Sequence, residues 1–321
     1  MRYHPTQPLP FGPPVAVIVG QPGVGKTTLA YAYSGLLYDF DRGAARAVNP
    51  GRETEVPGAA SELTFSEAAL APYRGVVLDT ARGWLEMLTA GIVGEAPKFR
   101  TSAGELSQQG WGVLRHRAEA TMATLHRLDR ELLCTAHPKD VRIGDQLKVR
   151  PDVQGGSRDL LLRRATLIGR LEQRGGRRVL DFNTTDTFDG KNPGQWPALT
   201  VPPAAQLAAF LDELFDDARR ALRRLAEESA AIAREVARWK GEVDALRSAE
   251  EFTTTYQRLQ AIETAQPLVF TQAKHLLDQA RRRYAMRWTG SAFVDATSER
   301  SENLLRSATP RQAALLEERA S

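Results

Sequence analysis

The chain has 321 residues, enough for two folded domains of ordinary size, and its content of 42% apolar and 26% charged residues excludes a largely disordered protein. The net charge of +4 does not require a polyanionic partner, although a pI near 9.3 permits one where basic residues cluster. The single cysteine, Cys134, excludes an internal disulfide framework, and the lack of a secretion signal or of about 20 consecutive apolar residues predicts a cytoplasmic protein without a membrane segment.

Short apolar runs alternate with helical stretches through the first two-thirds of the chain. After a proline-rich lead-in, the runs predict strands at residues 15–19, 36–38, 76–78, 132–134, 165–168 and 179–180. Helical stretches separate several of these strands, at residues 26–34, 82–90 and 111–128. Such alternation predicts an α/β fold with a mostly parallel sheet and helices on both faces. The last two strands have Gly175 and Gly176 between them, which predicts a hairpin turn.

The composition changes at Pro202-Pro203, after which Ala, Arg, Glu and Leu dominate. Apolar residues from Leu211 to Leu246 recur at spacings of three, four and seven, which predicts one long helix, as in a coiled-coil arm. Capping boxes at 248–251 and 309–312 predict further helix starts, and Pro267 interrupts the helical pattern between them. We therefore expect an α/β domain at residues 1–203 and an all-α module at residues 204–321.

A phosphate-binding motif lies between the first predicted strand and the helix after it. Residues 20–27 fit the P-loop (Walker A) pattern G-x-x-x-x-G-K-[ST]. Glycines let backbone N–H groups point at phosphate oxygens, Lys26 supplies a charge to the terminal phosphates, and the Thr27 hydroxyl ligates Mg²⁺. A glycine-rich turn that matches by chance is the alternative, which the flanking strand and helix disfavour. The expected nucleotide-binding residues are Gly20, Gln21, Pro22, Gly23, Val24, Gly25, Lys26, Thr27 and Thr28.

A P-loop needs a second magnesium anchor, usually an aspartate at the end of a neighbouring buried strand. Asp79 ends the apolar run at 75–78, so its carboxylate is expected beside Thr27. The alternative is that Asp79 caps the helix that follows it. No Asn-Lys-x-Asp motif for reading guanine occurs in the chain, which favours ATP over GTP.

Four further segments follow the P-loop in order, at residues 38–46, 133–140, 150–157 and 187–194. Together with the P-loop, this series resembles the phage-encoded AAA-domain nucleotide-binding proteins, a RecA-like group that includes single-strand-annealing ATPases of the Sak type. The resemblance covers residues 11–203 and is faint in the helical C-terminal part. It implies a RecA-like P-loop NTPase core, an ATPase activity that uses ATP and Mg²⁺, and a homo-oligomer.

The resemblance also implies roles for residues at the ends of strands. Asp41 lies where RecA-like ATPases place the acidic residue that polarises the attacking water, but it is one methylene shorter than their glutamate, so the strength of hydrolysis is open. Asp41 as a helix cap, or as an ion-pair partner of Arg42 or Arg46, is the alternative. His137 lies where the group has a polar sensor of the γ-phosphate, and a histidine satisfied by the local backbone is the alternative.

Lys191 lies on the turn at residues 190–193. In RecA-type filaments, lysines from a neighbouring subunit complete the ATP site and act like an arginine finger, and the resemblance gives Lys191 this role. A solvated loop lysine is the alternative. The expected catalytic set is therefore Lys26, Asp41, Asp79, His137 and Lys191.

Two stretches match the segments with which RecA-like proteins hold DNA, residues 91–110 and 138–156. The second has glycines that give flexibility and basic side chains suited to phosphates, namely Lys139, Arg142, Lys148 and Arg150. Aspartates are interleaved with these residues and no aromatic side chain lies between them, so a solvated loop is the alternative.

These observations predict an ATP-binding and ATP-hydrolysing protein that acts on single-stranded DNA in phage recombination, annealing or replication. The alternative is a nucleotide-gated interaction protein with weak ATPase activity. In that interpretation the long helix at 204–247 docks a helicase or a single-strand-binding protein. A small-molecule kinase is a third interpretation, but no arginine-rich lid supports it.

Overall fold

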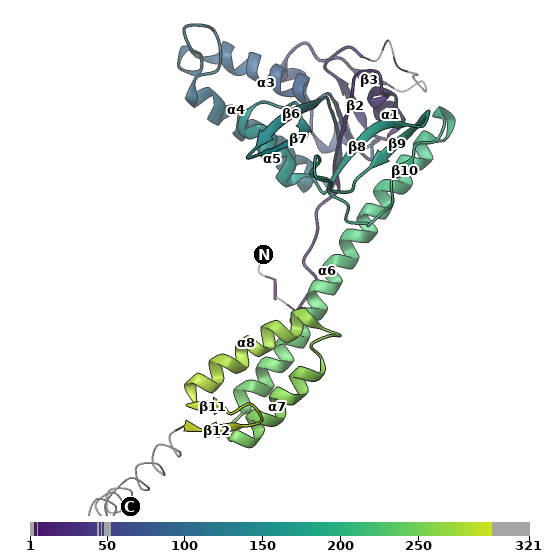
Figure 1. Ribbon diagram of the computed structural model, residues 1–321. Helices are drawn as coiled ribbons and strands as arrows, with labels where there is room; N and C mark the ends of the chain where they lie inside the picture. Colours follow the sequence, from purple (N-terminus) through teal and green to yellow (C-terminus); the bar gives the residue numbers. More distant parts are fainter. Residues whose placement is uncertain (1–2, 5, 44, 46, 48–52, 297–321) are drawn as a thin grey trace, which may run out of the picture. The chain divides into compact units, whose positions relative to one another are not determined.

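The computed structural model describes residues 3–4, 6–43, 45, 47 and 53–296, and its elements are traced in Figure 1. The described chain forms two compact units. One comprises residues 11–224, and the other joins residues 1–10 to the chain from Leu225 onward. The sequence places a domain boundary at residue 203, before the long helix α6 (Leu207–Ala245), whereas the division into units falls inside this helix. The first turns of α6 belong with the sheet because Leu211 and Phe215 pack in its core.

The first unit is built on an eight-stranded sheet with the order β10-β9-β8-β1-β5-β4-β2-β3. Strands β8, β1, β5, β4, β2 and β3 are parallel; at one edge β9 pairs antiparallel with β8, and β10 pairs antiparallel with β9. The strands are β1 (Val15–Gly20), β2 (Leu36–Asp39), β3 (Thr54–Glu55), β4 (Gly75–Asp79), β5 (Glu131–Ala136), β8 (Leu167–Arg174), β9 (Arg177–Asp181) and β10 (Leu199–Thr200). All six predicted strands are therefore present, and β8 and β9 form the predicted hairpin.

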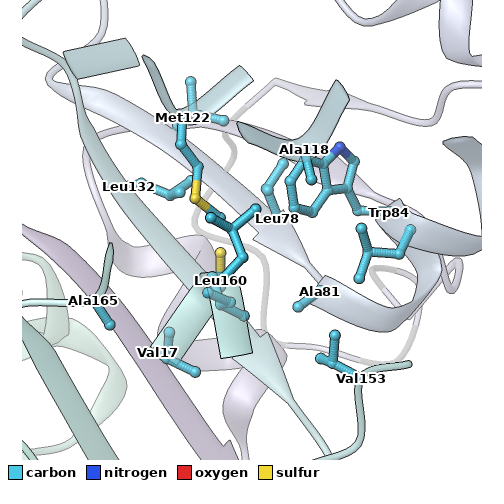
Figure 2. Packing of buried hydrophobic residues seen from close by; sticks show 14 of the residues in the cluster. Val17, Leu78, Ala81, Trp84, Ala118, Met122, Leu132, Val153, Leu160 and Ala165 are labelled. Carbon is cyan, nitrogen blue, oxygen red and sulfur yellow. The ribbon is translucent and has the colours of Figure 1, made fainter. Parts of the chain in front are cut away.

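Helices cover both faces of this sheet because successive strand residues point to opposite sides. Val17 faces a core shared with α3 (Ala81–Glu95), α4 (Gln108–Arg127) and α5 (Gly155–Arg164), and Figure 2 shows it with Trp84 and Met122 of two of these helices. Its neighbours Ala16 and Ile18 face a second core with α1 (Lys26–Ala32) and the start of α6. A short helix, α2 (Glu67–Leu70), precedes β4. The predicted fold class, an α/β fold with a mostly parallel sheet and a helical C-terminal part, is confirmed.

Residues 138–151 form a β-hairpin, where the sequence analysis expected flexible loops. Strand β6 (Pro138–Ile143) pairs with β7 (Gln146–Pro151), and Gly144 in the turn has φ 60°. Apolar and charged residues alternate along β6, as in Val141-Arg142-Ile143, which suits a strand exposed on one face. Residues 155–164, partly assigned to the same loop, form α5.

The second unit is mainly helical, but it is not the all-α module that the sequence predicts, because residues 286–295 form a β-hairpin. It contains the C-terminal half of α6, α7 (Ala249–Ala261), α8 (Pro267–Arg283) and a hairpin of β11 (Met286–Trp288) and β12 (Phe293–Asp295). Ser248 and Glu251 form the predicted capping box, and Trp239 is a core residue only 2% exposed. The second capping box, at 309–312, lies outside the described residues. No helix in the described ranges is long and apolar enough to cross a bilayer.

Candidate nucleotide-binding site

The P-loop connects the end of β1 to the start of α1. Gly23 and Gly25 have φ of 78° and 103°, a backbone conformation that residues with a side chain rarely adopt. Gly20, the last residue of β1, is close-packed, because a Cβ there would lie 2.8 Å from the carbonyl oxygen of Leu171. The glycines of the motif are therefore required by the path of the backbone.

Lys26 is buried, with 6% of its surface exposed. Its Nζ donates to the carbonyl oxygens of Gly20 at 2.8 Å and Gln21 at 3.0 Å, and it lies 3.4 Å from Nδ1 of His137. Burial lowers the pKa of the Lys26 ammonium, and the nearby carboxylate of Asp79 acts in the opposite direction. A cation is thus held inside the loop.

A cavity of about 430 Å³ opens beside this lysine, within the range of small-molecule sites. Because the carboxyl ends of parallel strands meet at one edge of the sheet, residues after β2, β4 and β5 reach the same cavity as the P-loop. The lining residues that the sequence predicts are Pro22, Gly23, Gly25, Lys26, Thr27, Thr28, Asp41, Asp79 and His137. The structure therefore brings four of the five predicted catalytic residues together.

Asp79 is the last residue of β4 and is 1% exposed. Its carboxylate accepts hydrogen bonds from the hydroxyls of Thr135 and Thr27. Burial raises the pKa of Asp79, these two hydrogen bonds oppose the shift, and the neighbouring carboxylates of Asp39 and Asp41 add to it. Like charges gathered at one point are the surroundings that a divalent cation would stabilise.

The alternative role for Asp79, as a helix cap, is wrong. The residue that caps α3 is Thr80, whose Oγ1 accepts from the N–H of Gly83 at 3.2 Å. Among the described residues, no three His, Cys, Asp or Glu side chains form a metal site by themselves. A Mg²⁺ ion here would therefore be held by Thr27, Asp79 and phosphate oxygens, and the hydrogen-bonded pair of half-buried Thr27 and buried Asp79 fits that arrangement.

Asp41 lies beyond the end of β2 and borders the cavity. Its Oδ2 accepts a hydrogen bond from Oγ1 of Thr80 at 3.0 Å, so the carboxylate is tied to the residue that follows Asp79. Of its two expected ion-pair partners, Arg46 lies outside the described residues. The geometry leaves the carboxylate facing the cavity, where an attacking water molecule could be polarised.

His137 follows β5 and sits between the P-loop lysine and the β6–β7 hairpin. Burial lowers its pKa below the ordinary 6.5, the charges of Lys26 and Arg82 act in the same direction, and Asp41 and Asp152 act against it. We expect a neutral imidazole at pH 6.5 and an NMR titration midpoint below that value. The folded state binds this proton less tightly than the unfolded chain, so the stability contributed by His137 is complete above pH 6.5 and is lost as the pH falls below it.

In the variant His137→Gln the NMR resonance of His137 disappears, which assigns it. The variant should also lose the part of the pH dependence of stability that His137 contributes. A midpoint at or above pH 6.5 for His137 would contradict the prediction, because it would mean that the imidazole readily accepts a proton beside Lys26.

Lys191 does not reach the cavity of its own chain. Its Nζ donates to the carbonyl oxygens of Leu162 at 2.7 Å and Ala165 at 2.8 Å, at the end of α5. Its backbone forms a bridge with Ile168 of β8. Lys191 is therefore engaged in a cap of α5, where the sequence analysis expected an exposed loop. A role in a neighbouring subunit's site stays a prediction, and it would require the ammonium to leave these carbonyls.

Three of the four basic residues expected to hold DNA are ion-paired within the chain. Lys148 and Arg150 on β7 both contact Asp189, and Lys139 lies 3.6 Å from Asp152. Arg142, near the hairpin turn, has no ion pair to a described residue. The hairpin is therefore less basic than its sequence indicates.

Two residues that line the cavity or lie next to it are not predicted by the sequence motifs. Asp39 is fully buried at the end of β2 and accepts from the N–H of Gly43 at 3.0 Å. An acidic residue ending a buried strand is the signal that could have found it, as it found Asp79. Arg178 of β9 also lines the cavity, and no local pattern points to it because the pairing of β8 with β9 brings it there.

The comparison with protein families agrees with this geometry. A family model described as an AAA domain matches residues 13–193, more than half of the chain. The chain belongs to this AAA domain family. Its α/β sheet and P-loop are accordingly those of an AAA-domain P-loop NTPase, a group that generally uses ATP and Mg²⁺.

Among solved structures, the chain is similar to the flagellar accessory protein FlaH of Methanocaldococcus jannaschii. The identity is 13%, the similarity covers 53% of this chain and 77% of FlaH, and the TM-score is 0.27. No curated protein matches the chain.

Proposed function

We propose that this protein binds Mg·ATP in its P-loop and hydrolyses it. The observation that carries the proposal is the single cavity that gathers Lys26, Thr27, Asp41, Asp79 and His137 from four separate segments. Lys26 offsets the charge of the terminal phosphates, and Thr27 with Asp79 holds the metal ion, which when bound neutralises the charge that develops on the transferred phosphoryl group. Asp41 polarises the attacking water, and His137 contacts the γ-phosphate.

We further propose that the ATPase acts on single-stranded DNA in phage recombination, annealing or replication, as a homo-oligomer. The resemblance to Sak-type proteins supports this, and so does the position of the β6–β7 hairpin. The N–H of Asp152, just after β7, donates to the carbonyl oxygen of His137 at 2.8 Å, so the base of the hairpin is tied to the γ-phosphate sensor. Arg82 also reaches Asp152, at 2.5 Å. A shift of His137 on hydrolysis would therefore move the hairpin.

Binding of a fluorescent oligothymidine with ATP, with ADP and without nucleotide tests this role. We expect the oligonucleotide to bind more tightly with ATP. Arg142→Ala should weaken this binding by about three- to tenfold. It should also reduce the slope of log K against log salt concentration by about 0.7, since one phosphate contact is lost. The matched control is Arg223→Ala, which removes an exposed arginine of α6. Equal binding by both variants, or no effect of nucleotide, would count against the DNA role.

The second candidate function is a nucleotide-gated interaction protein that docks a helicase or a single-strand-binding protein through its helical part. Two observations favour it. Three of the four hairpin residues expected to contact DNA are already ion-paired, and residues 225–296 carry as many acidic as basic side chains, which suits a protein partner better than a polyanion. ATP turnover measured with and without single-stranded DNA separates the two functions. A protein that acts on DNA should show turnover that DNA stimulates, whereas an interaction protein should show negligible turnover under both conditions.

A further inference from the structure

Arg178, on strand β9, lies against the P-loop although it is far from it in the sequence. Its guanidinium carbon is 3.1 Å from the position that a Cβ at Gly25 would take. The side chain also lines the cavity of the candidate site together with Lys26 and Thr27. A second cation therefore borders the space that the proposed nucleotide would fill.

The sheet fixes the backbone of Arg178 in this place. It pairs with Gln173 across the β8–β9 hairpin, and its carbonyl oxygen accepts from the N–H of Val201 at 2.9 Å. Because side chains alternate along a strand, Arg178 shares its face with Leu180, which packs in the core beneath α1, whereas Arg177 points to the other face. Arg178 is thus directed at the P-loop by the register of the sheet.

The guanidinium of Arg178 has no partner among the residues that the structure describes. Arg178 is exposed, and its side chain has no hydrogen bond or ion pair to any residue that the structure describes. By contrast, Arg174 on the partner strand is paired with Glu172 and Asp181. The five N–H donors of Arg178 therefore remain free for a ligand in the cavity.

We propose that Arg178 is a second cation of the phosphate site, supplied by the same chain as the P-loop, and that it binds the phosphate oxygens of the nucleotide. This inference rests on the proposed function, since it requires the P-loop to take a nucleoside triphosphate. A guanidinium keeps its charge at every physiological pH, and its planar fork can bind phosphate oxygens through two parallel hydrogen bonds. It complements Lys26, which is a compact point charge inside the loop.

This assignment changes what the protein needs from a neighbour. The sequence places the additional cation on Lys191 of an adjacent subunit, but Lys191 is engaged at the end of α5. With Arg178 in place, one chain contains a P-loop lysine, a metal-binding pair and an arginine for the phosphates. Nucleotide affinity should then be the same for isolated and assembled chains.

Calorimetric titration of the full-length protein with Mg·ATP and with Mg·ADP tests the contact. We expect Arg178→Ala to bind ATP about 10- to 100-fold more weakly, the usual effect of losing a hydrogen-bonded charge, and Arg178→Lys to lose less. The matched control, Arg177→Ala, removes an exposed arginine from the adjacent position and should bind like the wild type. Thermal melts of all variants should coincide, because Arg178 makes no buried contact.

Mixing variants tests whether the arginine acts within its own chain. Lys26→Ala and Arg178→Ala each lack one cation, so in an equimolar mixture no chain carries both. If Arg178 acts within its chain, the mixture shows no high-affinity ATP binding. Recovery of high-affinity sites would show that Arg178 serves a neighbouring subunit and would overturn the inference.

The outcomes distinguish this inference from the proposed function. Wild-type protein that takes up no ATP overturns both. Wild-type protein that binds ATP while Arg178→Ala and Arg178→Lys bind it equally well overturns only the role of Arg178. Weaker binding by Arg177→Ala to the same extent as Arg178→Ala also overturns it, because the effect would then follow from net charge alone.

Discussion

Replacing Glu131 with alanine should destabilise the unit at residues 11–224 by about 3–5 kcal/mol, the usual result of removing one partner from a buried ion-paired cluster. Glu131, the first residue of β5, has no exposed surface. Arg74 binds its carboxylate through two nitrogens, at 2.6 and 3.1 Å. Arg219 of α6 donates to it at 2.6 Å and the hydroxyl of Tyr33 at 2.5 Å.

The destabilisation follows from what the substitution leaves behind. Two guanidinium groups would lose the buried carboxylate that they share and would keep exposed partners, such as Asp216 for Arg74 and Asp129 for Arg219, and the buried Tyr33 hydroxyl would lose this acceptor. Burial, followed by the charge of Glu131, raises the pKa of Tyr33 well above its ordinary value, so this hydroxyl keeps the proton that it donates. Because Arg219 belongs to α6, the variant should also loosen the first turns of that helix from the sheet.

Urea unfolding followed by circular dichroism measures the effect. The control is Glu119→Ala, which removes an exposed ion pair with Arg164 and should cost at most about 1 kcal/mol. Glu131→Gln should fall between the two, since it keeps the shape and some of the hydrogen bonds. If Glu131→Ala changes the free energy of unfolding no more than Glu119→Ala does, the buried carboxylate does not hold the cluster together.

Replacing Lys26 with alanine should lower ATP turnover by about 10²- to 10³-fold, the size of effect seen when one preorganised charge-stabilising group is removed from a reaction centre. Lys26 is buried inside the loop. Among the residues that the structure describes, no other lysine lines the cavity and could take over its charge. The same variant should bind Mg·ATP about 10- to 100-fold more weakly, because a charge-assisted contact to the phosphates is lost.

The control for this variant is Lys240→Ala, which removes an exposed lysine of α6 in the second unit. Phosphate release and calorimetry should both leave this control at the wild-type level. If Lys26→Ala hydrolyses ATP at the wild-type rate and its thermal melt is unchanged, the P-loop is not the site of hydrolysis.

Much of the site could be predicted from the sequence because its chemistry is local. The glycines of residues 20–25 are demanded by the backbone path, and Gly23 and Gly25 do have positive φ. Asp79 is predicted because it directly follows an unbroken apolar run, and His137 is predicted from the family resemblance; both lie where parallel strands end at a common edge of the sheet. For these residues the position along the chain already fixes the position in space.

The basic residues show where this reasoning stops. The charges at 139–150 suggested a flexible DNA-binding loop, but their partners Asp152 and Asp189 are placed beside them only by the fold. Lys191 looked like a free loop lysine because the carbonyls that it meets belong to α5, a helix that the sequence analysis did not identify. A long side chain shows its charge in the sequence, but its partner is set by packing.

By itself, the sequence determined six strands of the main sheet and the helices between several of them, the phosphate-binding turn and the acidic residue beside it, because backbone torsions and apolar periodicity act over a few residues. Only the tertiary structure decided which cations are free. The antiparallel register of β8 and β9 carries Arg178 to Gly25, and the docking of α6 gives Glu131 its second guanidinium. Both contacts join residues that are far apart in the chain, so no local pattern could specify them.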